Sequence, residues 1–198
     1  WGIRFNNERS WFLAHKQDYE AHLLAPTRAL GEQVYEALHA AFPKEPFLLK
    51  LSRIYRDARR LHGNGPYKDH LWFCVRAGGE DWTGRPTFYF EIGPDYYSYG
   101  MGFWAPKAAL MEAYRKAVDE HPEVLEKLVK RFNKQAQFTL SGPEYARKKT
   151  APSPLLAAWY NKKSINLQHD AAPDERMFSQ ELAQDIIEGF RTLMPLYK

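Results

Sequence analysis

Residues Thr87 to Trp104 read TFYFEIGPDYYSYGMGFW and carry the most regular pattern in the chain. Large apolar and polar side chains alternate over the first six residues, which is the period of a β-strand with one buried face. Gly93-Pro94-Asp95 then supplies the residues of a turn, and the alternation resumes after it. This stretch therefore predicts a hairpin of two antiparallel strands.

The returning strand of this hairpin has two unequal faces. One face carries large side chains and the other carries small ones: Tyr97, Tyr99, Met101 and Phe103 against Ser98, Gly100 and Gly102. Two glycines in alternate positions leave the second face bare, so a backbone, an aromatic ring or a ligand can approach it closely.

Further strand patterns lie around the hairpin. The apolar run Leu71–Val75 predicts a buried strand, and short strands are expected at Phe138–Leu140 and Ile165–His169. Phe47 to Tyr55 is compatible with either a strand or a helix. Strands that are neighbours in sequence and joined by tight turns favour antiparallel pairing.

Helical periodicity occupies both ends of the chain. Apolar residues recur at helical spacing from Arg9 to Leu23, from Pro26 to Phe42, and in two segments after Pro106 that are divided at His121-Pro122. Pro106 is expected at the first position of its helix. Pro152–Tyr160 also looks helical, and Ser179 is the expected N-cap of the last helix, with Glu181 in its first turn.

The order of these elements defines the fold class. Helices come first, strands occupy the middle, and helices return, which favours an α+β fold over alternating βαβ units. We expect a mostly antiparallel sheet of about four to six strands that includes the hairpin 87–104 and is packed by the N-terminal and C-terminal helices. The 198 residues suit a single domain, 1–198.

Composition narrows the class of protein. Apolar residues make up 44% of the chain, which is typical of a folded globular protein. The lone cysteine, Cys74, cannot form an internal disulfide, no signal peptide is visible, and no apolar run reaches the length of a membrane span. We therefore expect a cytoplasmic protein without a membrane partner.

Positive charge is concentrated in two segments. Arg53 to His70 has a net charge of +3, Glu144 to Lys163 has +4, and the rest of the chain has −3. Such clustering indicates an anionic partner more strongly than the total of +4 does. A solvated basic surface is the alternative for both segments.

The first segment, RIYRDARRLHGNGPYKDH, is the candidate ligand-binding site. The planar guanidinium of arginine suits two-pronged binding of phosphate or carboxylate, and Pro66 stiffens the loop before Tyr67 and Lys68. In the alternative interpretation, the Asp–Arg pairs and the Tyr67 ring merely tie the loop to the sheet. The candidate residues, including one carboxylate from the hairpin, are Arg53, Tyr55, Arg56, Asp57, Tyr67, Lys68, His70 and Glu91.

The second segment flanks Trp159-Tyr160 with Arg147-Lys148-Lys149 and Lys162-Lys163. Aromatic rings among basic residues can hold single-stranded nucleic acid, but a solvated helix with buried rings is the favoured interpretation. Glycine-rich phosphate loops, nucleophile elbows and HExxH are missing, and the histidines are scattered. We predict no metal and no cofactor.

The string Asn6-Asn7-Glu8-Arg9-Ser10-Trp11-Phe12, followed by Lys16 and Tyr19, resembles the opening of the DUF2461 family of bacterial proteins. Ile54-Tyr55-Arg56-Asp57 and Pro66-Tyr67-Lys68 resemble its second motif, and Tyr99-Gly100 to Pro106 resembles its glycine-bearing strand. The family usually has Phe-Ser-Lys-Asp where this chain has Leu61-His62-Gly63-Asn64, so one lysine is missing here. The resemblance implies a cytoplasmic α+β protein and no particular activity.

Three functions remain open at this point. The first is binding of an anionic small molecule at residues 53–70, with nucleic acid as a further anionic partner. The second is a metal-independent enzyme that acts on a phosphorylated or carboxylated substrate at the same residues, with Tyr67, Lys68 or His70 as acid or base. The third is a protein–protein scaffold that uses exposed aromatic residues.

Overall fold

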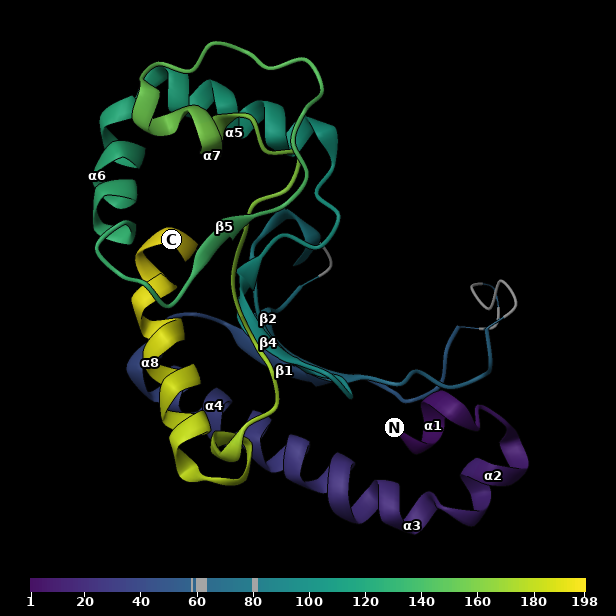
Figure 1. The fold of residues 1–198 in the computed structure, drawn as a ribbon. Helices are drawn as coiled ribbons and strands as arrows, with labels where there is room; N and C mark the ends of the chain where they lie inside the picture. The colour runs from purple at the N-terminus through teal and green to yellow at the C-terminus, as the bar shows by residue number, and fades with distance from the viewer. Residues whose placement is uncertain (58, 60–63, 80–81) are drawn as a thin grey trace.

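The structure is a computed structural model that describes residues 1–57, 59, 64–79 and 82–198. Its centre is a six-stranded antiparallel sheet with the strand order β1-β2-β3-β4-β6-β5 (Figure 1). The fold class is therefore α+β, as predicted. The strands are β1 (Phe47–Leu51), β2 (Leu71–Ala77), β3 (Thr87–Ile92), β4 (Tyr97–Gly102), β5 (Thr139–Ser141) and β6 (Asn166–Ala171).

The hairpin pairs as its alternation requires. Thr87 lies opposite Gly102 and Ile92 lies opposite Tyr97, so the turn spans residues 93–96. The bare face of β4 is approached by the backbone of β6: a Cβ atom added to Gly100 would lie 2.0 Å from the Leu167 carbonyl oxygen. The glycines could allow a backbone, an aromatic ring or a ligand to approach, and at Gly100 it is a backbone that does so.

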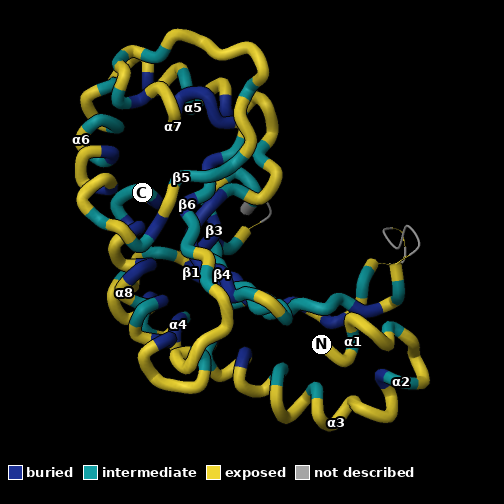
Figure 2. Tube along the Cα trace, in the orientation of Figure 1, coloured by how far each residue is buried: buried dark blue, intermediate teal, exposed yellow. Residues whose placement is uncertain are grey.

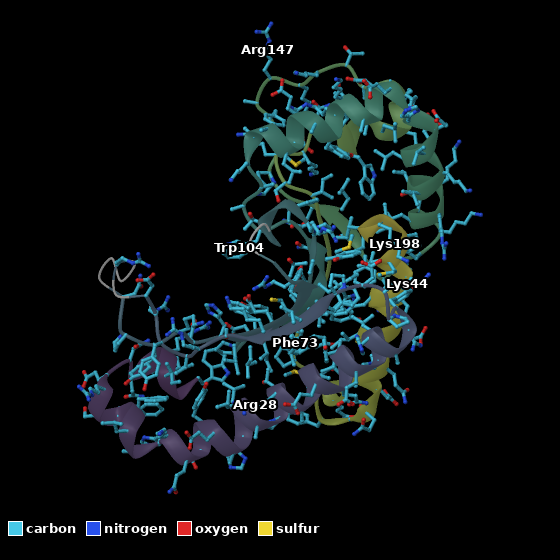
Figure 3. All side chains as sticks on the ribbon, turned by 180° about the vertical axis from the view of Figure 1, so that it is seen from behind. Arg28, Lys44, Phe73, Trp104, Arg147 and Lys198 are labelled. Carbon is cyan, nitrogen blue, oxygen red and sulfur yellow. The ribbon has the colours of Figure 1, made fainter. Side chains whose placement is uncertain are left out.

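Two long helices, α4 (Ala25–Ala41) and α8 (Gln180–Tyr197), cover one face of the sheet (Figure 1). Phe73, labelled in Figure 3, lies between the sheet and α4, where Gly31 leaves room for its ring. Ser179 caps α8 as predicted, because its side chain accepts a hydrogen bond from the Glu181 N–H. The largest fully buried side chains of this layer include Val34, Leu38, Phe73, Phe88, Phe90, Ile186, Phe190 and Leu193.

A second group of helices lies beyond β5: α5 (Ala108–Glu120), α6 (Pro122–Phe132), the 3₁₀ turn η4 (Pro154–Leu156) and α7 (Ala157–Tyr160). The prediction that Pro106 is the first residue of α5 is wrong by two positions. Ala105 has a positive φ of 50° and Lys107 is extended, so the chain turns before the helix begins at Ala108. Similarly, 152–160 is α-helical only in its last four residues.

The N-terminal region is a chain of short helical pieces: α1 (Gly2–Phe5), α2 (Arg9–Ala14), α3 (Lys16–Tyr19) and the π-helical turn η1 (Glu20–Leu24), which runs into α4. The predicted helix over 9–23 is interrupted at His15, where φ and ψ leave the helical region. Figure 2 shows that most of this region is exposed. Two further 3₁₀ turns are η3 (Trp82–Gly84) and η5 (Glu175–Phe178).

The sheet face opposite α4 and α8 is polar. Side chains alternate between the two faces along each strand, and paired residues of neighbouring strands share a face. We call the face opposite the two helices the polar sheet face. Tyr89 shows the arrangement directly, because its hydroxyl lies 3.3 Å from the Ser98 hydroxyl on the next strand. The face comprises Lys50, Trp72, Cys74, Arg76, Tyr89, Glu91, Ser98, Gln168 and Asp170. Within the described residues, no helix is long and apolar enough to cross a membrane.

Candidate functional site

The first basic segment connects β1 to β2 and continues their pairing beyond the sheet. Tyr55 and Tyr67 form an isolated antiparallel bridge, the Arg56 N–H donates to the Pro66 carbonyl at 2.8 Å, and the Lys68 N–H donates to the Ile54 carbonyl at 2.8 Å. Residues 53–57 and 64–70 thus form a narrow two-stranded extension, called the arm below, which projects beside α1 in Figure 1. The predicted loop residues Arg60 and His62 lie outside the described residues, as does most of the Leu61–Asn64 departure from the family.

Tyr67 is buried at the base of the arm. Its side chain is 2% exposed, and its ring stacks on Phe12 of α2 with the centroids 4.2 Å apart. The Asn7 side chain bonds both backbone groups of Tyr67, because its Nδ2 donates to the carbonyl at 2.9 Å and its Oδ1 accepts from the N–H at 3.0 Å. With Ile54, these rings form a small second core. Tyr67 therefore ties the arm to the N-terminal helices.

Arg56 is partly used in the same tie. Its Nε donates to the Tyr67 carbonyl at 2.8 Å. Gly65 is also explained by Asn7, because a Cβ at Gly65 would lie 2.3 Å from Asn7 Oδ1. The two sequence motifs that resemble the family, one at 6–12 and one in the arm, thus contact each other directly.

The carboxylates of the arm are paired with arginines. Asp57 accepts hydrogen bonds from the Arg59 N–H and Nε at 3.0 Å and from its Nη2 at 2.7 Å. Asp69 accepts from Arg4 Nε at 2.8 Å and lies 3.2 Å from His70 Nδ1. Burial raises the pKa of Asp69, but the hydrogen bonds from Arg4 and His70 outweigh burial and hold the pKa below its usual value.

The Lys68 side chain extends from the arm toward Trp72 of the polar sheet face. Its Nζ is 5.7 Å from the centroid of the Trp72 ring, a cation–π contact. Partial burial lowers the pKa of Lys68, the Glu91 carboxylate counteracts this through space, and the charges of Arg53 and Arg56 lower it further. The cations Arg53, Arg56 and Lys68 are thus close enough to influence one another, and Glu91 is the carboxylate near them.

Glu91 and Trp72 occupy neighbouring strands at this place. Trp72 of β2 lies directly opposite Glu91 of β3. The hydroxyl of Tyr96 donates a hydrogen bond to Glu91 Oε1, and both burial and this hydrogen bond raise the pKa of Tyr96, so that its proton is held. We call Arg53, Arg56, Lys68, Trp72 and Glu91 the Lys68 site.

The Lys68 site contains four of the eight predicted residues: Arg53, Arg56, Lys68 and Glu91. Asp57 and His70 hydrogen-bond to neighbouring residues of the segment, and Tyr55, 56% exposed, rests its ring 5.3 Å from that of Tyr67. Sequence reasoning missed Trp72 and the residues that hold the arm, Arg4 and Asn7. A signal was available for Trp72: it lies two alternate positions after Lys68, so an extended chain would place both side chains on the same face.

The second basic segment is arranged differently. Lys162 is 8% exposed, and its Nζ donates to the Gly142 carbonyl at 3.0 Å and lies 3.2 Å from Glu144 Oε1. Lys148 pairs with the other oxygen of Glu144 at 3.0 Å. The Trp159 and Tyr160 rings are buried, so they cannot stack on bases. Arg147 points outward from the loop that bears it (Figure 3).

A pocket of about 250 Å³ lies beneath the arm, between it and the N-terminal helices. Trp1, Trp11 and Tyr19 contribute aromatic walls, and Ile54, Lys68 and Asp69 line its arm side. The exposed apolar side chains Trp1 and Phe5 stack at its border, and Arg4 lies 5.1 Å above the Trp1 ring. This apolar patch therefore adjoins the arm.

The described part of the chain contains neither a cluster of metal-binding side chains nor an activated thiol. No group of three or more His, Cys, Asp or Glu residues there is arranged to hold a metal ion. Cys74 lies on the polar sheet face but is 7% exposed, and burial raises the pKa of its thiol. A thiol held protonated in this way is a weak nucleophile.

Comparison with known proteins gives one result. The sequence pattern of a family described as a conserved hypothetical protein (DUF2461) matches residues 2–198, which include the N-terminal motif, the arm and the Lys68 site. No curated protein matches the chain. The match extends over essentially the whole fold, and the description of the family names no ligand and no reaction.

Proposed function

The chain belongs to the DUF2461 family, and for this member we propose that the Lys68 site binds an anionic small molecule bearing a phosphate or carboxylate group. The observation that carries the proposal is the crowding of positive charge around Lys68. Arg53 and Arg56 lie close enough to lower its pKa, and Glu91 is the carboxylate that opposes them. An anion would complete the charge balance of the site.

The physical basis is the cost of placing like charges together in a half-buried setting. Burial weakens the screening by water, so repulsion between cations is stronger here than on an open surface. A bound phosphate or carboxylate turns this repulsion into attraction, and guanidinium groups can bind its oxygens in pairs. The Trp72 ring offers a flat apolar wall beside the charges.

A thermal-shift screen of phosphorylated metabolites, nucleotides and small carboxylates tests the proposal. A ligand should raise the melting temperature of the wild type and of Lys44→Met, which removes an exposed lysine far from the site, but not that of Lys68→Met. If the shift is as large in Lys68→Met as in the wild type, the anion does not bind at this site.

Nucleic acid is a separate outcome of the same screen. Binding of an oligonucleotide should weaken steeply as salt is raised, because the condensed counterions of the strand are released on binding. The polar sheet face presents Trp72 and Tyr89 but also Glu91 and Asp170, whose charges oppose a polyanion. We therefore favour a small anion over a nucleic acid. The cytoplasmic location stays a prediction that rests on the sequence pattern, including the lone cysteine, and on the family resemblance.

An enzymatic role at the same site is the second candidate. The observation that favours it is the hydrogen bond between Tyr96 and Glu91 beside the Lys68 amine. An amine, a carboxylate and a phenol together can accept, relay and return a proton.

A further inference from the structure

We propose that Lys68 is a nucleophilic amine that condenses with the carbonyl group of a small anionic substrate, forming an imine. The substrate class is an aldehyde or ketone that also bears a carboxylate or a phosphate. The inference rests on the proposed function, because the same cations that bind the anion would position the carbonyl carbon beside Lys68 Nζ.

The backbone under Lys68 is held on both sides, which fixes the point from which its side chain extends. The Lys68 N–H donates to the Ile54 carbonyl at 2.8 Å, and the preceding residue, Tyr67, is bonded twice by Asn7. The side chain extends from this anchored strand to place Nζ over the Trp72 ring. An amine presented from a rigid element can be aimed at a reacting atom more accurately than one on a loop.

The surroundings of Lys68 favour the neutral, nucleophilic form of the amine. Burial is the main cause that lowers its pKa, and although the Glu91 carboxylate raises it, Arg53 and Arg56 act with burial and the net direction is downward. Lysines are activated in this way by apolar surroundings or by another cation. Lys162 differs in its contacts: it is more deeply buried than Lys68, and its Nζ is paired with Glu144 and the Gly142 carbonyl.

The chemistry balances without an oxidant or reductant. The nitrogen lone pair of Lys68 forms a bond to the carbonyl carbon, and the π electrons of the C=O bond move to oxygen. Two protons pass from nitrogen to that oxygen, the first as the carbinolamine forms and the second as it breaks down, so the oxygen leaves as water while the C=N bond forms. The Glu91 carboxylate lies opposite Trp72 on β3 and can accept each proton from the nitrogen and return it to the oxygen, and Tyr96 already donates a hydrogen bond to Glu91. The products are an imine and one molecule of water.

Two further groups suit the reaction. The guanidinium groups of Arg53 and Arg56 would hold the anionic group of the substrate, which raises the effective concentration of the carbonyl next to the amine. The Trp72 ring shields one side of Nζ from water, which slows hydrolysis of the imine.

Reductive trapping tests the inference on the intact chain. The protein is incubated with glyoxylate, which carries both an aldehyde and a carboxylate, and sodium borohydride reduces any imine to a stable secondary amine that peptide mass spectrometry locates. We expect Lys68 to be labelled several-fold faster than the exposed Lys44, because its pKa is lowered and the arginines hold the carboxylate of glyoxylate beside it. Propanal, which lacks the anion, should lose most of this preference.

Variants separate the reasons for failure. Lys68→Arg keeps the charge but not the nucleophile, so it should bind glyoxylate in a thermal-shift assay and show no label at this position. Equal labelling rates at Lys68 and Lys44 in the wild type would overturn the imine proposal. If glyoxylate still stabilises the wild type but not Lys68→Met, anion binding stands while the imine fails. If no anion stabilises the protein and no preference is seen, both proposals fail.

Discussion

The two basic segments have similar composition, yet the structure uses them in opposite ways. In 144–163, Glu144 pairs with both Lys148 and Lys162, and the neighbouring aromatic rings lie in the core. In the arm, the carboxylates pair away from Lys68, which is left beside Arg53 and Arg56. The comparison shows that clustered cations can have different neighbours, and the proposed binding site lies where the carboxylates of the segment itself are engaged elsewhere.

The difference has a geometric cause. Glu144 and Lys148 are four residues apart, and Glu144 also forms an isolated antiparallel bridge with Lys162, so one carboxylate reaches two amines. Lys68 and Asp69 are adjacent in the arm, but their side chains contact different partners. Asp69 pairs with Arg4 of α1, while Lys68 Nζ lies over the ring of Trp72 on β2.

The largest expected effect concerns the tie that holds the arm. Tyr67→Ala removes a buried ring from the small second core, and we expect the free energy of unfolding to fall by about 3 kcal/mol. Tyr55→Ala, at the half-exposed ring across the bridge, should cost less than about 1 kcal/mol. Urea unfolding of both variants measures this. Equal losses would mean that Tyr67 does not anchor the arm.

The second effect concerns the paired lysine of the other segment. Lys162→Met leaves the Gly142 carbonyl and Glu144 without their amine, so we expect a loss of about 2 kcal/mol in the free energy of unfolding. Lys163→Met, at the exposed neighbour, should change it by less than about 0.5 kcal/mol. An unchanged unfolding midpoint for Lys162→Met would remove the contrast between the segments.

A smaller effect on stability is expected at Lys68 itself. Lys68→Met should leave the free energy of unfolding within about 0.5 kcal/mol of the wild type or raise it, because the substitution removes the cost of burying a charge and the repulsion from Arg53 and Arg56, which together outweigh the lost attraction of Glu91. The same variant should lose the ligand-induced thermal shift. A loss of stability as large as that expected for Lys162→Met would make Lys68 a structural residue and argue against the site.

The smallest effect is a pH dependence. The pKa of Lys68 is lower in the folded chain than in the unfolded chain, so between these two values the unfolded chain binds the proton that the folded chain has lost. Stability contributed by this group therefore rises as pH increases through that window. The wild type should gain stability relative to Lys68→Met as the pH rises toward about 10, the usual pKa of lysine and the upper limit of this window. Chemical unfolding at several pH values, with Lys44→Met as the control, measures the difference; a parallel pH course for wild type and Lys68→Met would contradict it.

Much of the fold follows from local pattern. The hairpin, the short strands near 138 and 165, and the N-cap at Ser179 are all in the structure, because alternation and capping depend on residues close in sequence. The start of α5 and the break at His15 differ from the prediction, because backbone angles at Ala105 and His15 override the pattern around them. The pairing of β4 with β6 was not predictable, since it joins segments more than 60 residues apart.

The sequence by itself determined the elements, the apolar and polar faces of the strands, and the two segments in which positive charge gathers. The tertiary structure alone decided that Asn7 and Phe12 hold Tyr67, that β6 fills the space beside Gly100, and that Trp72 joins Lys68 and Glu91. The physical reason is the distance along the chain over which each feature is set. Periodicity records which face a residue occupies, whereas the partner of a charge depends on which distant strand or helix packs against that face.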